Sequence, residues 1–304
     1  MRPAFALLAL AGAAIFAACQ QSAPATSTTT AAPEAVIAAP ARARPAAPAW
    51  PALPPLFAAA DTLTPAMRAV VQAHDLSRLW DNTADPAGPN PSFDGFFGPD
   101  HYRFGMVFNE VTRDPVNSAI YHLRGKCNYH KSKNIRPFTG TLTVRQVLPL
   151  RYPGFLQAKS MTQNRAADSV AGRLYTARAQ LQLIETPATD SGIFEGEVLL
   201  DFFVVPGQPA GYVYVFEFEG SDDRLPTRGG LLRLRGNRRN VTTGQVKPFL
   251  VAPNVVAIAP LLFKDFMLDE RMGEINPKYA KLGWSDYWQN DEWWADSAQP
   301  KLRL

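Results

Sequence analysis

The chain has 304 residues and a formal net charge of +4, with 46% hydrophobic and 19% charged residues. A chain of this length holds one large domain or two small ones. It contains no Gly-rich phosphate loop, Gly-x-Ser-x-Gly, His-Glu-x-x-His or Cys-x-x-Cys motif. We therefore expect no cofactor and favour a binding role over an enzymatic one.

The chain opens with the layout of an export signal over residues 1–18. Arg2 precedes the apolar run Ala4–Ala18, which is shorter than the roughly 20 residues that a membrane-spanning helix needs. The run ends in FAAC (residues 16–19), which resembles the lipobox of bacterial lipoproteins. The resemblance implies that Cys19 becomes the mature N-terminus and carries acyl chains that anchor the protein in a membrane. The alternative is an ordinary signal peptide that is removed together with Cys19.

Localisation follows from the same resemblance. Gln20 after the lipobox cysteine favours the outer membrane, on its periplasmic side or at the cell surface.

Residues 19–60 are rich in Ala, Pro, Ser and Thr, which predicts a disordered tether, because so little apolar bulk cannot offset the entropy of ordering the chain. About 40 residues at up to ~3.1 Å each could reach ~120 Å from the membrane. An exported protein is not expected to bind nucleic acid.

Residues 61–100 are expected to hold a helix and a Gly/Pro loop that leads into a sheet. Thr64 suits a helix N-cap and Pro65 the first helical position, in a helical stretch that ends near Trp80.

A group of polar residues follows in FDGFFGPDHYRF (residues 93–104). Asp94, Asp100 and His101 stand there beside four phenylalanines. Carboxylates and imidazole are the materials of general acid–base catalysis, so these three are weak catalytic candidates. The alternative is a loop whose phenylalanines close one end of the core.

A hydrophobic period of two predicts a mainly β, antiparallel domain over residues 101–255. Short polar turns and the absence of crossover helices favour a meander, with one longer loop at 148–171. Eight strands are expected, at 101–111, 118–129, 136–147, 172–185, 193–205, 211–220, 228–236 and 241–251.

The strands are expected to form a barrel or a two-sheet sandwich. Gly125, Gly140 and Gly196 fall on the apolar faces, which favours a closing barrel. A helical turn ending in Trp80, eight meandering strands and a following helix resemble the lipocalins over about 80–275. The Gly-x-Trp signature of that family is absent, because Arg78 stands two residues before Trp80. A barrel of this size is either filled by side chains or holds one small ligand.

The most favoured function is binding of a small apolar or amphipathic ligand in the barrel or at its mouth. Cys127 has the inward parity and is expected to be buried. The expected ligand-lining residues are the aromatics of the inner parity, which would equally make a solid core: Tyr121, Phe138, Tyr175, Phe194, Tyr212, Tyr214 and Phe216. In that second case the protein is a tethered envelope scaffold.

Two basic stretches, Lys126–Arg136 and Arg228–Arg239, are interpreted as solvated strand faces and turns. The alternative is a surface for an envelope polyanion or a protein partner. His122 and His130 share parity, but about eight residues of strand separate them by about 26 Å, so no metal site is predicted. Both are expected to face solvent.

Residues 256–304 are expected to form a helical, Trp-rich segment packed on the β domain. An amphipathic helix is predicted around 259–273, and four tryptophans follow. These four would form a carbohydrate-binding platform if exposed, or a strap over the sheet if buried: Trp284, Trp288, Trp293 and Trp294.

Overall fold

The computed structural model describes residues 62–81, 92–151, 173–186, 190–213, 224–229, 231–268, 274–289 and 292–295. Contacts within the chain divide it after Pro45, so that Ala46–Leu304 forms the second of two units. All described residues lie in the second unit, which therefore contains the whole barrel and its core. The expected signal peptide, Cys19 and tether lie outside the described residues. None of the described helices is long and apolar enough to cross a bilayer.

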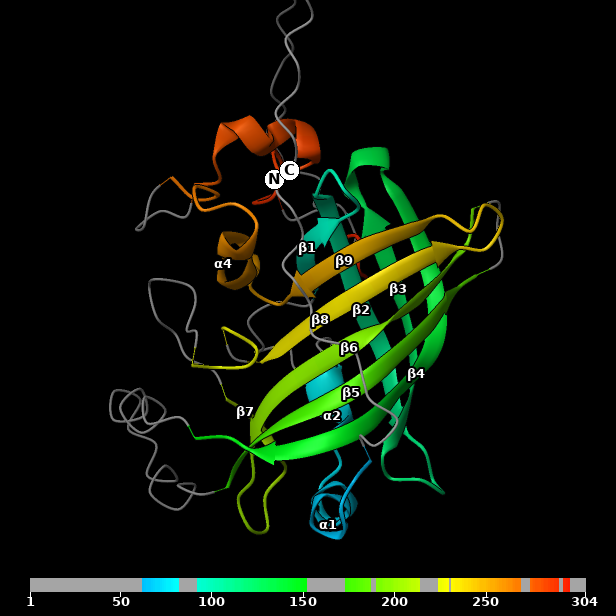
Figure 1. Ribbon diagram of the computed structural model, residues 1–304, viewed down its shortest axis with the longest axis vertical. Helices are drawn as coiled ribbons and strands as arrows, with labels where there is room; N and C mark the ends of the chain where they lie inside the picture. Colours follow the sequence, from blue (N-terminus) through cyan, green and yellow to red (C-terminus); the bar gives the residue numbers. More distant parts are fainter. Residues whose placement is uncertain are drawn as a thin grey trace, which may run out of the picture. The chain divides into compact units, whose positions relative to one another are not determined.

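The second unit is built on a closed antiparallel β-barrel (Figure 1). Hydrogen-bonded neighbours run around the barrel in sequence order, and pairing of β1 with β9 and of β5 with β6 closes it without a free edge. The predicted barrel is thus confirmed and the sandwich excluded. The staves are β1 (Phe93–Phe97), β2 (Tyr102–Arg113), β3 (Ile120–Tyr129), β4 (Asn134–Pro149), β5 (Leu174–Glu185), β6 (Gly192–Phe203), β8 (Leu232–Asn240) and β9 (Val246–Ala252).

Two strand predictions are corrected. The eighth stave is β1, which lies within the segment predicted as a loop. The strand has only five residues, and the Gly and Pro residues close to it are typical of loops, so the sequence pattern did not indicate a strand. Of the segment predicted as a strand over 211–220, residues 211–213 are described, and they contribute β7 (Gly211–Tyr212), which pairs with the end of β6. Because β6 pairs directly with β8, β7 does not lie between them as a stave, and residues 214–220 lie outside the described residues.

The last hairpin lies later in the chain than predicted. Its turn spans residues 241–245, because the Asn240 side chain accepts hydrogen bonds from the backbone N–H groups of Thr242 and Thr243. Gly244, with φ of 70°, supplies the left-handed residue that such a turn requires.

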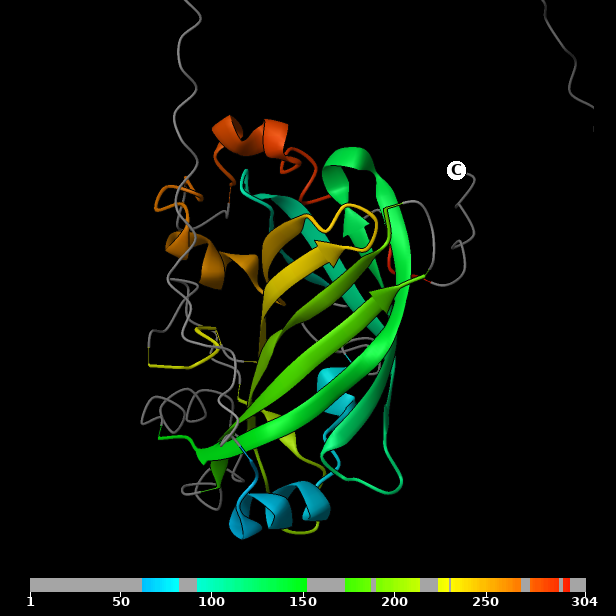
Figure 2. The same ribbon diagram turned by 45° about the vertical axis from the view of Figure 1, so that its right-hand side comes forward.

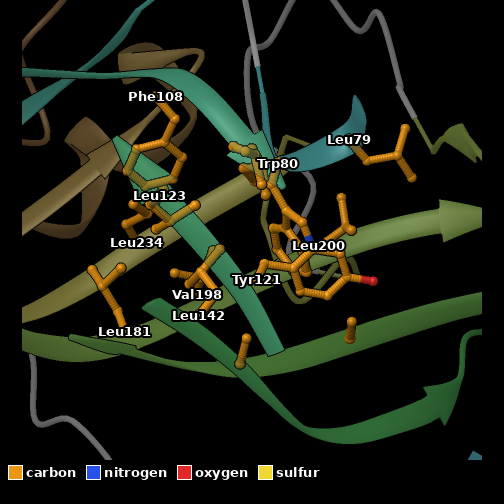
Figure 3. Close-up of a cluster of buried hydrophobic side chains, with 14 of the residues drawn as sticks. Leu79, Trp80, Phe108, Tyr121, Leu123, Leu142, Leu181, Val198, Leu200 and Leu234 are labelled. Carbon is orange, nitrogen blue, oxygen red and sulfur yellow. The ribbon is translucent and has the colours of Figure 1, made fainter. Parts of the chain in front are cut away.

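The barrel interior is packed with apolar side chains from every stave. Figure 3 shows part of this core. Tyr121, Phe108, Leu142 and Leu181 are fully buried there, and Cys127 is buried as predicted. The predicted cap at Thr64 is confirmed, since its hydroxyl accepts from Met67 N and begins α1 (Pro65–Ala73).

A short second helix, α2 (Ser77–Trp80), lies inside the lower part of the barrel, and α1 lies below it (Figure 1). It brings Leu79 and Trp80 into the core, where the Trp80 ring packs edge-on against Tyr121. Trp80 is fully buried.

A separate apolar cluster covers the outer face of β1 and β9. Phe96 and Leu250 project outward there and pack with Phe263, Phe266 and Trp284 from the C-terminal segment. The helix predicted around 259–273 is not formed over 262–268. Instead α4 (Val255–Ile258) and η3 (Ala259–Leu261) are followed by a β-bridge between Met267 and Ile275. A last 3-10 helix, η4 (Pro277–Leu282), precedes Trp284.

Candidate functional site: a cationic pocket at the barrel mouth

The end of the barrel opposite α2 carries an open pocket. Here the β3–β4, β5–β6 and β8–β9 connections meet, and Figure 2 shows the β8–β9 turn beside the β3–β4 connection. The pocket has a volume of about 340 Å³, at the lower end of the range of ligand sites. Its walls are Phe97, Tyr129, Ser132, Asn134, Arg136, Asp190, Arg238, Asn240, Thr243, Gln245 and Lys247.

The pocket residues continue the inward faces of the staves. Arg136 lies two residues before buried Phe138, and Lys247 two before buried Phe249. Arg238 and Glu185 likewise lie two residues after inward Gly236 and Leu183. Since alternate residues of a strand share a face, all four project into the barrel at this end. The inward face therefore changes from apolar to charged at the mouth.

A buried carboxylate, Glu185, organises the floor of the pocket. Arg238 Nη2 donates to Glu185 Oε2 at 2.7 Å, and the Tyr129 hydroxyl donates to Glu185 Oε1 at 2.6 Å. Cys127 Sγ lies 3.4 Å from the same Oε1, and Arg136 Nη1 lies 3.6 Å from Oε2. This layer separates the pocket from the apolar core below it.

Burial and neighbouring charges determine the protonation states of the floor residues. Burial, and next the neighbouring Glu185 carboxylate, raise the pKa of the Cys127 thiol well above its ordinary value, so the thiol stays protonated. Burial also raises the pKa of Tyr129. Burial lowers the pKa of Arg238, but the hydrogen bond with Glu185 leads the effects that raise it by more. The floor therefore holds a permanent guanidinium and no reactive thiolate.

The walls above the floor are suited to an anion. Arg136 Nη1 donates to the backbone carbonyl of Asp190 at 2.7 Å, and Arg238 donates to that same oxygen. These bonds hold both guanidinium groups at the pocket. Lys247 Nζ lies 5.9 Å from the centroid of the Phe97 ring. Three cations, against the carboxylates of Asp190 and Glu185, leave a positive balance that fits a carboxylate or phosphate.

The aromatic residues predicted to line a ligand site lie mostly in the packed core. Tyr121, Phe138 and Phe194 are fully buried there, and Tyr175 and Tyr212 are half-buried against the same cluster. None of these five lines the mouth pocket. Tyr214 and Phe216 lie outside the described residues.

The three weak catalytic candidates are engaged in separate structural contacts. Asp94 accepts from Arg103 Nε at 2.9 Å, and Asp100 accepts from the Tyr102 hydroxyl at 2.7 Å. His101 is fully buried, and its ring packs edge-on against Phe263. Asp94 and Asp100 thus each accept a hydrogen bond from a neighbouring side chain, and His101 packs in an apolar cluster.

The tryptophans of the C-terminal segment divide by burial. Trp284 and Trp293 are buried, Trp294 is half-buried, and Trp288 is 65% exposed. The segment straps the outside of the barrel, because Lys126 Nζ donates to the carbonyl of Ala295 at 2.8 Å. Gly105 on β2 leaves room for the Trp293 ring, which a Cβ atom there would meet at 2.6 Å.

The prediction that His130 faces solvent is wrong. Its side chain is buried and packs edge-on against the Trp293 ring. Burial, followed by the nearby Arg103 charge, lowers the pKa of His130 to about 3. His122 is exposed as predicted and bonds Asp114 at 2.9 Å. Among the described residues no three His, Cys, Asp or Glu side chains group as a metal site would require.

The chain matches no protein-family model, no curated protein and no solved structure. The closed eight-stranded antiparallel barrel is the architecture that the lipocalin resemblance implies, but no comparison supports membership of that family.

Proposed function

We propose that the protein is a lipid-anchored envelope protein that binds a small amphipathic acid at the mouth of its barrel. The acid group would sit among Arg136, Arg238 and Lys247, with the amides and hydroxyls of the walls as further partners. The lipobox resemblance at Cys19 supports the anchor, and the mouth pocket supports the binding role.

One observation carries the proposal: an open cationic pocket lies above a barrel whose interior is packed. The mouth pocket is open to a ligand, and its wall residues include Arg136, Arg238 and Lys247. Two arginines held by backbone and side-chain acceptors are preorganised for an acid group, which reduces the entropy lost on binding. A single charge-assisted hydrogen bond contributes about 1.5–3 kcal/mol.

Calorimetry on the unit Ala46–Leu304 tests the proposal, with decyl phosphate as the probe and decanol as its uncharged counterpart. We expect saturable binding of decyl phosphate and much weaker binding of decanol. The double variant Arg136→Met, Lys247→Met should lower the affinity for decyl phosphate by about 10- to 100-fold. Arg124→Met is the matched control, because Arg124 is exposed on the outer face of β3 and pairs with Glu110.

Equal binding of the two probes, or an affinity that the double variant leaves unchanged, would contradict the proposal. The tethered scaffold with a filled core would then be the better account, since a packed interior is also what such a scaffold requires. Mass spectrometry of molecules extracted from the gently purified protein would identify the natural acid.

A further inference from the structure

The pocket is surrounded by exposed aliphatic side chains. Ile184, Ile193, Arg239 and Val246 are successive cross-strand partners on β5, β6, β8 and β9. Each neighbours an inward-facing residue along its strand, so this row lies on the outer face at the mouth. Ile184 is 52% and Val246 55% exposed. Ile135 on β4 and Val241 in the β8–β9 turn are also exposed and complete what we call the mouth rim.

Cations are interspersed with these aliphatic side chains. Arg239 belongs to the row itself, and Lys131 and Lys133 are exposed in the β3–β4 connection. They add to the positive charge of Arg136 and Lys247 inside the pocket. Among the described residues, the mouth rim thus combines exposed apolar surface with a concentration of cations at one end of the barrel.

From this combination we infer that the mouth rim docks on an anionic phospholipid membrane. The inference rests on the proposed function and extends it: the acid bound in the pocket is the phosphate headgroup of a lipid in that membrane. Charge complementarity between the cations of the rim and anionic headgroups identifies the membrane as the partner. Aliphatic side chains on hairpin tips, mixed with Lys and Arg, suit shallow insertion among anionic headgroups. A protein interface would instead centre on a buried aromatic or Arg cluster.

The layering of the mouth explains why a headgroup, rather than a whole lipid, would enter. The Glu185, Arg238 and Tyr129 layer and the packed core beneath it close the barrel to an acyl chain. The pocket volume of about 340 Å³ is suited to a polar headgroup. The acyl chains would remain in the bilayer, beside the aliphatic residues of the rim.

Vesicle flotation with the unit Ala46–Leu304 tests the inference, because this unit lacks the candidate acylation site. Vesicles of phosphatidylcholine with about 30% phosphatidylglycerol are compared with vesicles of phosphatidylcholine alone. We expect binding to the anionic vesicles only. Ile184→Ser with Val246→Ser should lower the partition coefficient roughly tenfold. Lys247→Gln should lower it about fivefold, which corresponds to the loss of one cation near an anionic surface.

The matched control for the apolar pair is Val116→Ser with Leu148→Ser. Val116 is 94% exposed in the β2–β3 turn and Leu148 is exposed near the end of β4, both at the opposite end of the barrel. This control should leave vesicle binding unchanged. Equal losses in the rim pair and the control pair would overturn the inference.

Other outcomes separate this inference from the proposed function. Binding of decyl phosphate without binding to anionic vesicles would overturn the membrane inference and leave the acid site intact. Glycerol phosphate that binds as tightly as short-chain phosphatidylglycerol would assign the pocket to a free phosphate compound and also overturn the inference. Self-association in sedimentation velocity that Ile184→Ser with Val246→Ser abolishes, without vesicle binding, would assign the rim to a second copy of the chain.

Discussion

Arg238 on β8 reaches across β6 to Glu185 on β5, and the two strands are not neighbours. Gly192 on β6 makes this possible, because a Cβ atom at that position would meet Arg238 Nε at 2.3 Å. Both partners are buried, with Arg238 Nη2 and Glu185 Oε2 2.7 Å apart. A glycine in one strand thus permits the charge pair that forms the floor of the mouth pocket.

Gly192→Ala should therefore disrupt the floor. The methyl group displaces the Arg238 side chain and leaves Glu185 buried without its main partner, so the free energy of unfolding should fall by about 2–4 kcal/mol. Urea denaturation measures this loss. Ser191→Ala is the control, because Ser191 uses its backbone carbonyl to accept from Val241 N. In an Arg238→Ala background the effect of Gly192→Ala should shrink below about 1 kcal/mol; an undiminished effect would contradict the account.

The thiol of Cys127 should react slowly in the native protein. It is fully buried, and burial together with Glu185 raises its pKa well above the ordinary value, so little thiolate is present at neutral pH. Cys127 is the one cysteine of the unit Ala46–Leu304. Titration with an aromatic disulfide reagent should be slow in buffer and become fast in urea. Rapid reaction in buffer would show that this side chain is accessible.

Buried His130 should make the fold sensitive to mild acid. Its pKa is lowered to about 3 by burial and by Arg103, with Asp94 at 3.8 Å on the other side. Between pH 6.5 and pH 3 the unfolded chain binds a proton at His130 and the native protein does not, so stability falls as pH falls and levels off below about 3. From pH 7.5 to 4.5 this contribution is about 2.5 kcal/mol.

The measurement is urea unfolding of the wild type and His130→Gln at both pH values. The variant should lose about 2.5 kcal/mol less than the wild type between them. His122→Gln is the control, because that side chain is 53% exposed. An equal acid-induced loss in wild type and His130→Gln would mean that His130 titrates normally in the native state.

Substitution of Cys19 tests the proposed anchor. In the full chain, Cys19→Ala removes the thiol that would carry the diacylglycerol, so incorporation of a labelled fatty acid should be lost. The protein should move from the membrane fraction toward the soluble fraction. Unchanged labelling in Cys19→Ala would show that the lipid is attached elsewhere or absent.

Local patterns in the sequence were enough to predict much of the barrel. Alternation predicted β2 to β6 closely, because burying one face of a strand requires a period of two, and the same alternation placed Cys127 in the core. Thr64 and Pro65 marked the start of α1 through a local hydrogen bond and a fixed φ angle. Such features depend on residues a few positions apart.

Contacts between distant strands decided the rest. Which segment supplies the eighth stave depends on register around the whole barrel, so the prediction missed β1. Arg136 and Arg238 stand in two separate basic stretches, and only barrel closure brings them to one pocket. The local sequence places His130 at a turn, which predicts an exposed side chain. Its burial depends on Trp293, which is distant in the sequence and packs against it. Alternation tells which way a side chain points, whereas its neighbours depend on pairing across the barrel, which no local pattern encodes.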